Sequence, residues 1–334
     1  MNKEKEIINK ILSQLPKSKK HINEFHESDA EIIEFGSKKL LFTTDEFSSE
    51  DLFRDNDPHV LGWNMAVCTI SDILASGGTP EFYAHSIVAD ATKWNLEYMK
   101  LFAKGIADVL NLSGTAFIGG DLGTSKDWHY TGICLGETNK TITRKGAEEG
   151  DLIFITGYIG AGNLEAAIIL YSENKLISKL IKKYKTYFKL RLKESLVIKD
   201  YANCCIDTSD GVLNALNTIA EINNVGYEVK MLPYLKEGVI ACKLLSKPKT
   251  LLFMGECGEY ELMFTIKKED EEEFLNQARS KEIKVHRIGE ITRDSEKILH
   301  ESGKKIHFDD FEISGRNYDN VRDYLKDLTN YLSV

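Results

Sequence analysis

Residues 57–80 of the chain read DPHVLGWNMAVCTISDILASGGTP, and this stretch predicts a long buried helix. Asp57 followed by Pro58 is typical of a helix start, because aspartate can cap the first amides and proline fits the first turn. Apolar residues then recur at helical spacing. The helix is expected to stop at the glycine pair that precedes Pro80.

Asp72 is an unusual residue for the place it occupies in this helix. It lies near the helix end, between Ile70 and Ile73. A carboxylate there is disfavoured both by loss of water and by the negative end of the helix dipole. A nearby cation would remove both objections, so Asp72 is a candidate metal ligand.

Five more aspartates fall where ligand-handling residues are common, at strand ends and in the loops that follow. They are Asp45 at the end of strand 40–45, Asp121 after a strand and a glycine pair, Asp207 at the end of strand 204–207, Asp210 at the start of the next helix, and Asp29 before the first well-defined strand. Any one of them could be an ordinary turn or cap residue. Several converging carboxylates would repel each other unless divalent ions lay between them, and an all-aspartate set suits Mg²⁺ with a nucleotide better than zinc.

The composition is that of an ordinary soluble protein of two domains. The chain has 334 residues, of which 42% are hydrophobic and 28% charged, with a formal net charge of −9. This balance argues against nucleic acid or a membrane surface as the partner. No export signal is recognised, and the cysteines form no C-x-x-C pair or zinc spacing and are interpreted as buried free thiols, so a cytoplasmic protein is expected.

Strands and helices alternate on both sides of a charged, turn-rich stretch at 144–151. We therefore expect a two-domain α/β (α+β) protein with boundaries at 1–145 and 146–334. The lysine-rich segment 174–195 is best explained as a solvated helix face, with a phosphate site as the alternative.

Familiar catalytic motifs are missing from the sequence. GYIGAG (157–162) fits neither a dinucleotide fingerprint nor a Walker loop, and no G-x-x-x-x-G-K-[S/T] occurs. There is no G-x-S-x-G and no H-E-x-x-H either. If ATP binds, it binds without a P-loop.

Six segments together resemble the thiamine-monophosphate kinase family, within the superfamily of aminoimidazole ribonucleotide synthetase (PurM-like). They are TTD (43–45), NMAVCTISDILASGGTP (64–80), IGGDLGTS (118–125), TRKGAEEGDLIFITG (143–157), IDTSDG (206–211) and GEYEL (258–262). The resemblance covers roughly residues 25–320. It implies an N-terminal ATP- and Mg-binding domain that forms an intersubunit β-barrel in a homodimer, followed by a C-terminal α/β domain.

The resemblance also implies an activity, namely transfer of the ATP γ-phosphoryl group directly to thiamine monophosphate, with Mg²⁺ as cofactor and ATP as co-substrate. Carried over by motif, the metal ligands are Asp29, Thr43, Thr44, Asp45, Asp72, Asp121, Asp207 and Asp210. The ATP contacts are Gly120, Asp121, Arg144 and Ser209, and the substrate contacts are Glu261 and Tyr318. Asp72, Asp210 and Arg144 are the expected catalytic residues, since phosphoryl transfer depends on positioning and charge neutralisation.

The departures from the family pattern fall on the acceptor side. Leu52 stands where a substrate-binding histidine is usual, and Glu259 replaces an aspartate in GEYEL. The first acidic motif keeps only Asp29. Two alternatives therefore stay open, another ATP-using enzyme of the superfamily with a different acceptor, such as an amidine-forming synthetase or a maturation-type dehydratase, and a nucleotide-binding regulator.

Overall fold

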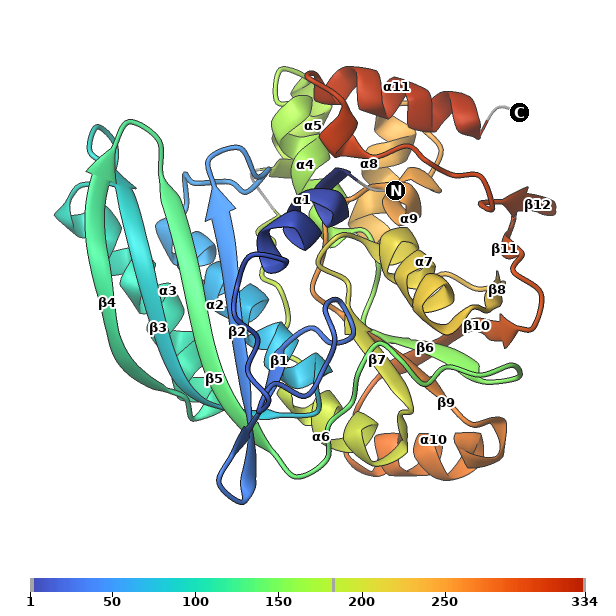
Figure 1. Cartoon of the computed structure of the whole chain (residues 1–334). Coiled ribbons are helices and arrows are strands. Elements are labelled where there is room, and N and C mark those ends of the chain that lie inside the picture. Colours follow the sequence, from blue (N-terminus) through green and yellow to red (C-terminus); the bar gives the residue numbers. More distant parts are fainter. Residues whose placement is uncertain (1–2, 182–183, 333–334) are drawn as a thin grey trace.

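The computed structural model describes residues 3–181 and 184–332, which form two sheets lying side by side with helices on their faces (Figure 1). A short helix, α1 (Lys3–Leu12), precedes the first sheet. In this part of the chain no helix is both long enough and apolar enough to cross a bilayer.

The first sheet has the strand order β1-β2-β5-β3-β4 and is open, with β1 and β4 at its edges. Its strands are β1 (Glu31–Phe35), β2 (Lys38–Ser48), β3 (Thr79–Asp90), β4 (Ala116–Ser125) and β5 (His129–Thr138). Helices α2 (Pro58–Ala75) and α3 (Leu96–Ser113) cover one face, the far one in Figure 1. All neighbouring strands run antiparallel except β3 and β4. The sheet does not close into a barrel within one chain.

Helix α2 confirms the prediction from residues 57–80. The side chain of Asp57 accepts a hydrogen bond from the backbone of Val60, and the chain leaves the helix through Gly77 at φ +75°. The helix lies very close to β5, because a Cβ at Gly132 would fall 2.0 Å from Thr69 Oγ1. This close approach brings the last turn of α2, and Asp72 with it, against the sheet.

The second sheet has the order β12-β11-β8-β10-β6-β9-β7. Its strands are β6 (Leu152–Thr156), β7 (Cys204–Asp207), β8 (Gly226–Val229), β9 (Leu262–Ile266), β10 (Val285–Thr292), β11 (Lys297–Glu301) and β12 (Lys304–His307). The helices are α4 (Ala161–Leu170), α5 (Lys175–Ile181), α6 (Leu192–Tyr201), α7 (Val212–Asn223), α8 (Lys236–Leu244), α9 (Leu251–Met254), α10 (Glu271–Ser280) and α11 (Val321–Tyr331), with short 3-10 turns at Lys268–Asp270 and Gly315–Asn317.

One hydrophobic core runs through both halves of the chain. Phe154, Phe264 and Phe274, on the α6/α10 side of the second sheet, belong to the same buried cluster as Met65 and Ile70 of α2. The opposite face of the second sheet packs on α7, α9 and α11 as a separate cluster. The two halves are therefore joined by packing, and the end of β7 faces α2.

Three expectations about local structure were wrong. β2 continues past Asp45 to Ser48, and β4 continues through Gly119-Gly120 to Ser125, so Asp45 and Asp121 lie within strands and not at their ends. Helix α7 begins at Val212, two residues after Asp210. Pairing with long neighbouring strands, which is invisible in local sequence, extends β2 and β4.

The segment 174–195 is not one solvated helix. Only Lys175–Ile181 and the residues from Leu192 onward are helical, and residues 184–190, which we call the strap, have no regular secondary structure. The strap lies along the N-terminal part of α2, where Asn64 bonds to the Thr186 carbonyl (2.9 Å) and to the Phe188 amide (3.0 Å). Positions 182 and 183 of the predicted helix lie outside the described residues.

Candidate active site

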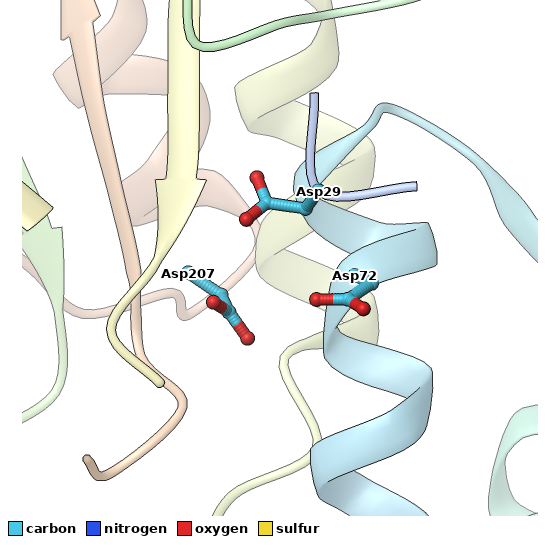
Figure 2. Close-up of side chains that lie close together, drawn as sticks. All are labelled: Asp29, Asp72 and Asp207. Carbon is cyan, nitrogen blue, oxygen red and sulfur yellow. The ribbon is translucent and has the colours of Figure 1, made fainter. Parts of the chain in front are cut away.

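Three aspartates from distant parts of the sequence meet between the two sheets. Asp29 comes from the loop before β1, Asp72 from the last turn of α2, and Asp207 from the end of β7 (Figure 2). One carboxylate oxygen of each lies within 4.8 Å of the others, which is close enough for a single metal ion to bind all three. We call these three residues the aspartate cluster.

Two residues of β2 extend the cluster. The Thr43 hydroxyl donates a hydrogen bond to Asp72 Oδ2 (2.5 Å). Asp45, two residues on, shares this face of the strand, because side chains of a strand alternate. Thr44 lies on the opposite face and its side chain is exposed, so only its backbone could take part in the same group.

The charges in this group destabilise one another. Burial and the charges of Asp207, Asp29 and Asp210 raise the pKa of Asp45 to about 8. Burial and the Asp29 charge raise the pKa of Asp207 to about 7, although hydrogen bonds from Ser71 and Ser209 oppose the shift. Burial, together with Asp45 and Asp207, raises the pKa of Asp72 well above its ordinary value. The site holds more negative charge than its surroundings compensate.

One cation, Arg144, lies against this group. Its Nη2 donates to Asp29 Oδ1 (2.6 Å) and its Nε to the same oxygen (3.2 Å). Burial raises the pKa of Asp29, and Arg144 works against that rise. Among the residues that the structure describes, one guanidinium beside four carboxylates leaves a clear deficit of positive charge.

The loop after β7 lines one side of the site. The Ser209 hydroxyl donates to Asp207 Oδ1 (2.8 Å), and the exposed Asp210 is near enough to raise the pKa of Asp45. Gly211 closes the loop at φ +81°, where a Cβ would lie 2.3 Å from the Gly255 carbonyl oxygen. The turn needs glycine, and it fixes where Ser209 and Asp210 point.

Gly120 and Asp121 do not join the aspartates in this chain. Gly120 pairs with His85, His85 with Gly132, and Gly132 with Asp45, so three strand spacings separate β4 from β2. At roughly 4.8 Å each, these spacings place Gly120 about 14 Å from Asp45 along the sheet. Both Gly120 and Asp121 are exposed on the edge strand.

The side chains of the two expected substrate residues bond to partners outside the aspartate cluster. Glu261 is buried, and its carboxylate accepts both Arg191 Nε and Nη2 (2.5 Å each) and the Thr156 hydroxyl (2.5 Å). Its backbone instead exchanges hydrogen bonds with Thr208, which steadies the loop after Asp207. The Tyr318 hydroxyl donates to Asp327 on α11 (2.8 Å).

Comparison with protein families identifies the architecture. Residues 27–138 match the N-terminal domain of AIR synthase related protein, and residues 148–301 match the C-terminal domain. The chain belongs to the AIR synthase related family. The resemblance inferred from the motifs is thereby confirmed.

Curated relatives within the AIR synthase related family are thiamine-monophosphate kinases. That of Pyrococcus horikoshii is 30% identical over 247 residues, which cover 72% of this chain and 77% of the relative. That of Aquifex aeolicus is 28% identical over 255 residues, covering 74% and 82%. AaThiL complexed with AMPPCP and TMP shares the fold, with a TM-score of 0.75 at 24% identity over 90% of this chain and 93% of that one.

Two residues that support this AIR synthase related site were missed from the sequence. Ser71 donates to Asp207 across the two halves, and its position directly before Asp72 was the available signal. Arg191 holds the buried Glu261. Nothing in the sequence links Arg191 to Glu261, because seventy positions separate them and the lysine-rich surroundings disguise it.

Proposed function

We propose that this chain is a thiamine-monophosphate kinase, which transfers the γ-phosphoryl group of ATP directly to the phosphate of thiamine monophosphate and gives thiamine diphosphate and ADP. The observation that carries the proposal is the convergence of Asp29, Asp72 and Asp207 at the junction of the two halves. Relatives of this chain with that activity extend over most of its length.

The donor set fits magnesium. All the contributing atoms are carboxylate or hydroxyl oxygens, which Mg²⁺ prefers, and the raised pKa values of Asp45, Asp72 and Asp207 mark a place where a divalent cation would relieve repulsion. The residues proposed to hold it are Asp29, Thr43, Thr44, Asp45, Asp72, Asp121, Asp207 and Asp210. When bound, magnesium would neutralise and orient the phosphate oxygens of ATP and of the acceptor.

The protein's own groups bind and orient the two substrates. Arg144 bonds to Asp29 and Ser209 to Asp207, so both lie beside the aspartate cluster and can donate hydrogen bonds to the phosphates. Cys68, the thiol of α2 near these aspartates, is a poor nucleophile because burial raises its pKa well above the ordinary value. Direct phosphoryl transfer needs no covalent enzyme intermediate, which agrees with the absence of a reactive thiol at Cys68.

The assay for this function is ADP release with Mg²⁺ and ATP, with and without thiamine monophosphate. We expect ADP and thiamine diphosphate to form in equal amounts, and only when the acceptor is present. Stoichiometry is checked by separating the thiamine phosphates after the reaction. ADP release that the acceptor does not stimulate would reject the kinase.

We further infer that two copies pair through the first sheet to form a homodimer with an intersubunit barrel. The edge strand β4 exposes Phe117, Ile118 and Leu122 by 51%, 58% and 63%, an apolar surface unusual for an isolated edge. Because Asp121 lies on this edge, far from Asp45 of its own chain, the Asp121 that completes each site would come from the second copy.

Mixing two inactive variants tests this arrangement. Asp72→Asn and Asp121→Asn should each be inactive, whereas a mixture refolded or co-expressed together should recover about a quarter of wild-type turnover, since half of the random dimers carry one intact site out of two. A sedimentation measurement should give a dimer, and Ile118→Asp should weaken it. A mixture that stays inactive while dimers form would show that each site is built within one chain.

We place the domain boundary at residues 145 and 146, and the protein in the cytoplasm. The Arg144 amide donates a hydrogen bond to the Glu27 carbonyl of the first half (2.8 Å), and the Gly146 amide donates to the Asn223 side chain of the second half (2.7 Å). These bonds support a passage of the chain from the first domain to the second between residues 144 and 146. All six cysteines are free thiols, as is usual in a reducing compartment.

A further inference from the structure

A buried ion pair lies where the strap meets the second sheet. Arg191, the residue before α6, donates from Nε and Nη2 to the two carboxylate oxygens of Glu261 (2.5 Å each). Its Nη1 donates to Glu194 (2.7 Å). The side chains of Arg191 and Glu261 are 14% and 6% exposed. Two parallel hydrogen bonds of this kind fix both the position and the direction of the carboxylate.

Gly157 leaves the space in which this pair fits. A Cβ at Gly157 would lie 2.1 Å from Arg191 Nη2 and 2.3 Å from Glu261 Oε1, and its φ is +60°. Thr156, one residue earlier, donates its hydroxyl to Glu261 Oε2 (2.5 Å). The first glycine of GYIGAG (157–162) therefore has a role that neither a dinucleotide fingerprint nor a Walker loop would explain, which is to let the ion pair close against the end of β6.

The backbone of Glu261 holds the loop 208–211. Its amide donates to the Thr208 hydroxyl (3.0 Å), and its carbonyl accepts from the Thr208 amide (2.9 Å). A Cβ at Gly258 would lie 2.0 Å from the Ser209 carbonyl oxygen, so the segment before Glu261 packs directly on this loop. The position of Glu261 therefore sets the position of a loop that is proposed above to bind ATP and Mg²⁺.

Arg191 is also connected to the helix that carries Asp72. The strap is fixed to α2 at Phe188, whose carbonyl accepts a hydrogen bond from the Trp63 indole (2.8 Å). Only two residues stand between Phe188 and Arg191. The guanidinium of Arg191 is therefore a direct link between α2 and the loop 208–211.

We propose that Arg191 is a positioning residue which, through Glu261, holds the loop 208–211 in the place relative to α2 that Mg²⁺ and the phosphates require, an inference that rests on the kinase function proposed above. Stability alone does not explain the pair, because apolar residues of similar volume often replace a buried ion pair without loss. Positioning does explain it, since a displacement of about 1 Å in an active site can cost about a hundredfold in rate.

Removing the guanidinium gives the kinetic test. Arg191→Met should lower kcat about a hundredfold and leave the KM for ATP within about threefold. Arg191→Lys keeps the charge but loses the two-pronged contact, so kcat should fall only about tenfold. Because Arg191 acts through Glu261, the double variant with Arg191→Met and Glu261→Gln should be no slower than the slower single variant.

The control for these variants is Arg287→Met, which removes an exposed arginine of β10 from its pair with Glu271 and should leave kcat unchanged. Circular dichroism checks the fold, and Arg191→Lys carries the test if Arg191→Met does not fold. Wild-type kcat in Arg191→Lys and Arg191→Met, or losses that multiply in the double variant, would overturn the proposal.

Gly157→Ala tests the same geometry without removing a charge. The added methyl group would displace the ion pair, so kcat should fall about tenfold. Gly36→Ala is the matched control, because Gly36 has a similar φ of +67° and nothing within 4 Å of its Cβ position. Backbone strain should lower the stability of both variants, whereas kcat should fall only in Gly157→Ala. Equal losses of kcat in the two variants, or no loss in Gly157→Ala, would contradict the proposed role.

Hydrogen exchange tests the loop without turnover. The Thr208 amide donates to the Glu261 carbonyl, and the Gly211 amide donates to the Thr208 carbonyl (3.1 Å). In the metal-free protein, exchange of these two amides should be about tenfold faster in Arg191→Met and Gly157→Ala than in the wild type, while α10 is unchanged. Unchanged exchange of the loop in both folded variants would overturn the proposal. If exchange increases as expected but the wild-type protein does not phosphorylate thiamine monophosphate, the kinase function fails and the role of Arg191 in holding the loop stands.

Discussion

Replacing Asp72 by asparagine should lower kcat by about a thousandfold and leave the fold intact. Asp72 is within metal-binding distance of Asp29 and Asp207 and is fixed by the Thr43 hydroxyl. Asparagine has the same shape but no charge, so the site loses one anionic ligand while the packing of α2 remains. The measurement is steady-state ADP release at saturating ATP and thiamine monophosphate, with circular dichroism to check the fold.

Two controls separate the site from general effects. Asp294→Asn removes an exposed carboxylate from a loop in the second half and should leave kcat unchanged. Thermal unfolding of metal-free Asp72→Asn at pH 8 should occur at or above the wild-type temperature, because the substitution removes repulsion with Asp45 and Asp207. Near-normal turnover by Asp72→Asn would show that Asp72 is not a metal ligand needed for catalysis.

Magnesium should stabilise the protein much more at pH 8.5 than at pH 6. In the metal-free folded state the pKa of Asp45 is about 8 and that of Asp207 about 7, whereas in the unfolded chain both are near 3.9. Between about pH 4 and pH 8 the folded state therefore binds more protons than the unfolded state, so the free energy of unfolding falls as the pH rises. Magnesium competes with these protons, and its affinity should increase over the same range.

Thermal unfolding with and without Mg²⁺ across this pH range measures the effect. At pH 8.5 and a free concentration of 100 Kd, magnesium should add about 2.7 kcal/mol to the free energy of unfolding. Asp45→Asn should flatten the metal-free pH dependence and reduce the gain from magnesium. An equal gain at pH 6 and pH 8.5 would contradict the assignment of the raised pKa values to the magnesium site.

The local sequence was enough to predict the helix that carries the site. The start and end of α2 are set by local signals, namely Asp57 and Pro58 at the start and the glycine pair at 77–78 at the end. The helix begins and ends where these residues indicate. The same is true of β7, which is short, buried and bounded as expected. Asp72 was conspicuous because a buried carboxylate near the C-terminal end of an apolar helix is disfavoured by the loss of water and by the helix dipole.

The features that failed depend on partners far away in the chain. β4 was expected to end at its glycines, but the hydrogen bonds of β3 carry it to Ser125. The strap looked like a solvated helix because of its lysines, yet Trp63 and Asn64 of α2 bind its backbone. The substrate roles of Glu261 and Tyr318, carried over from motifs, stay predictions, and the structure shows that their side chains bond to Arg191 and Asp327.

The aspartate cluster lies where the two halves of the chain pack together, with Asp207 in one half and Asp29 and Asp72 in the other. Their alignment is held from a distance by the strap on α2 and by the buried pair of Arg54 and Glu165. Small changes in the packing between the two halves would shift the carboxylates relative to one another without unfolding either half. Substitutions between the two halves should therefore first give protein that is folded but inactive. Activity should report changes in how the two halves pack more sensitively than stability does.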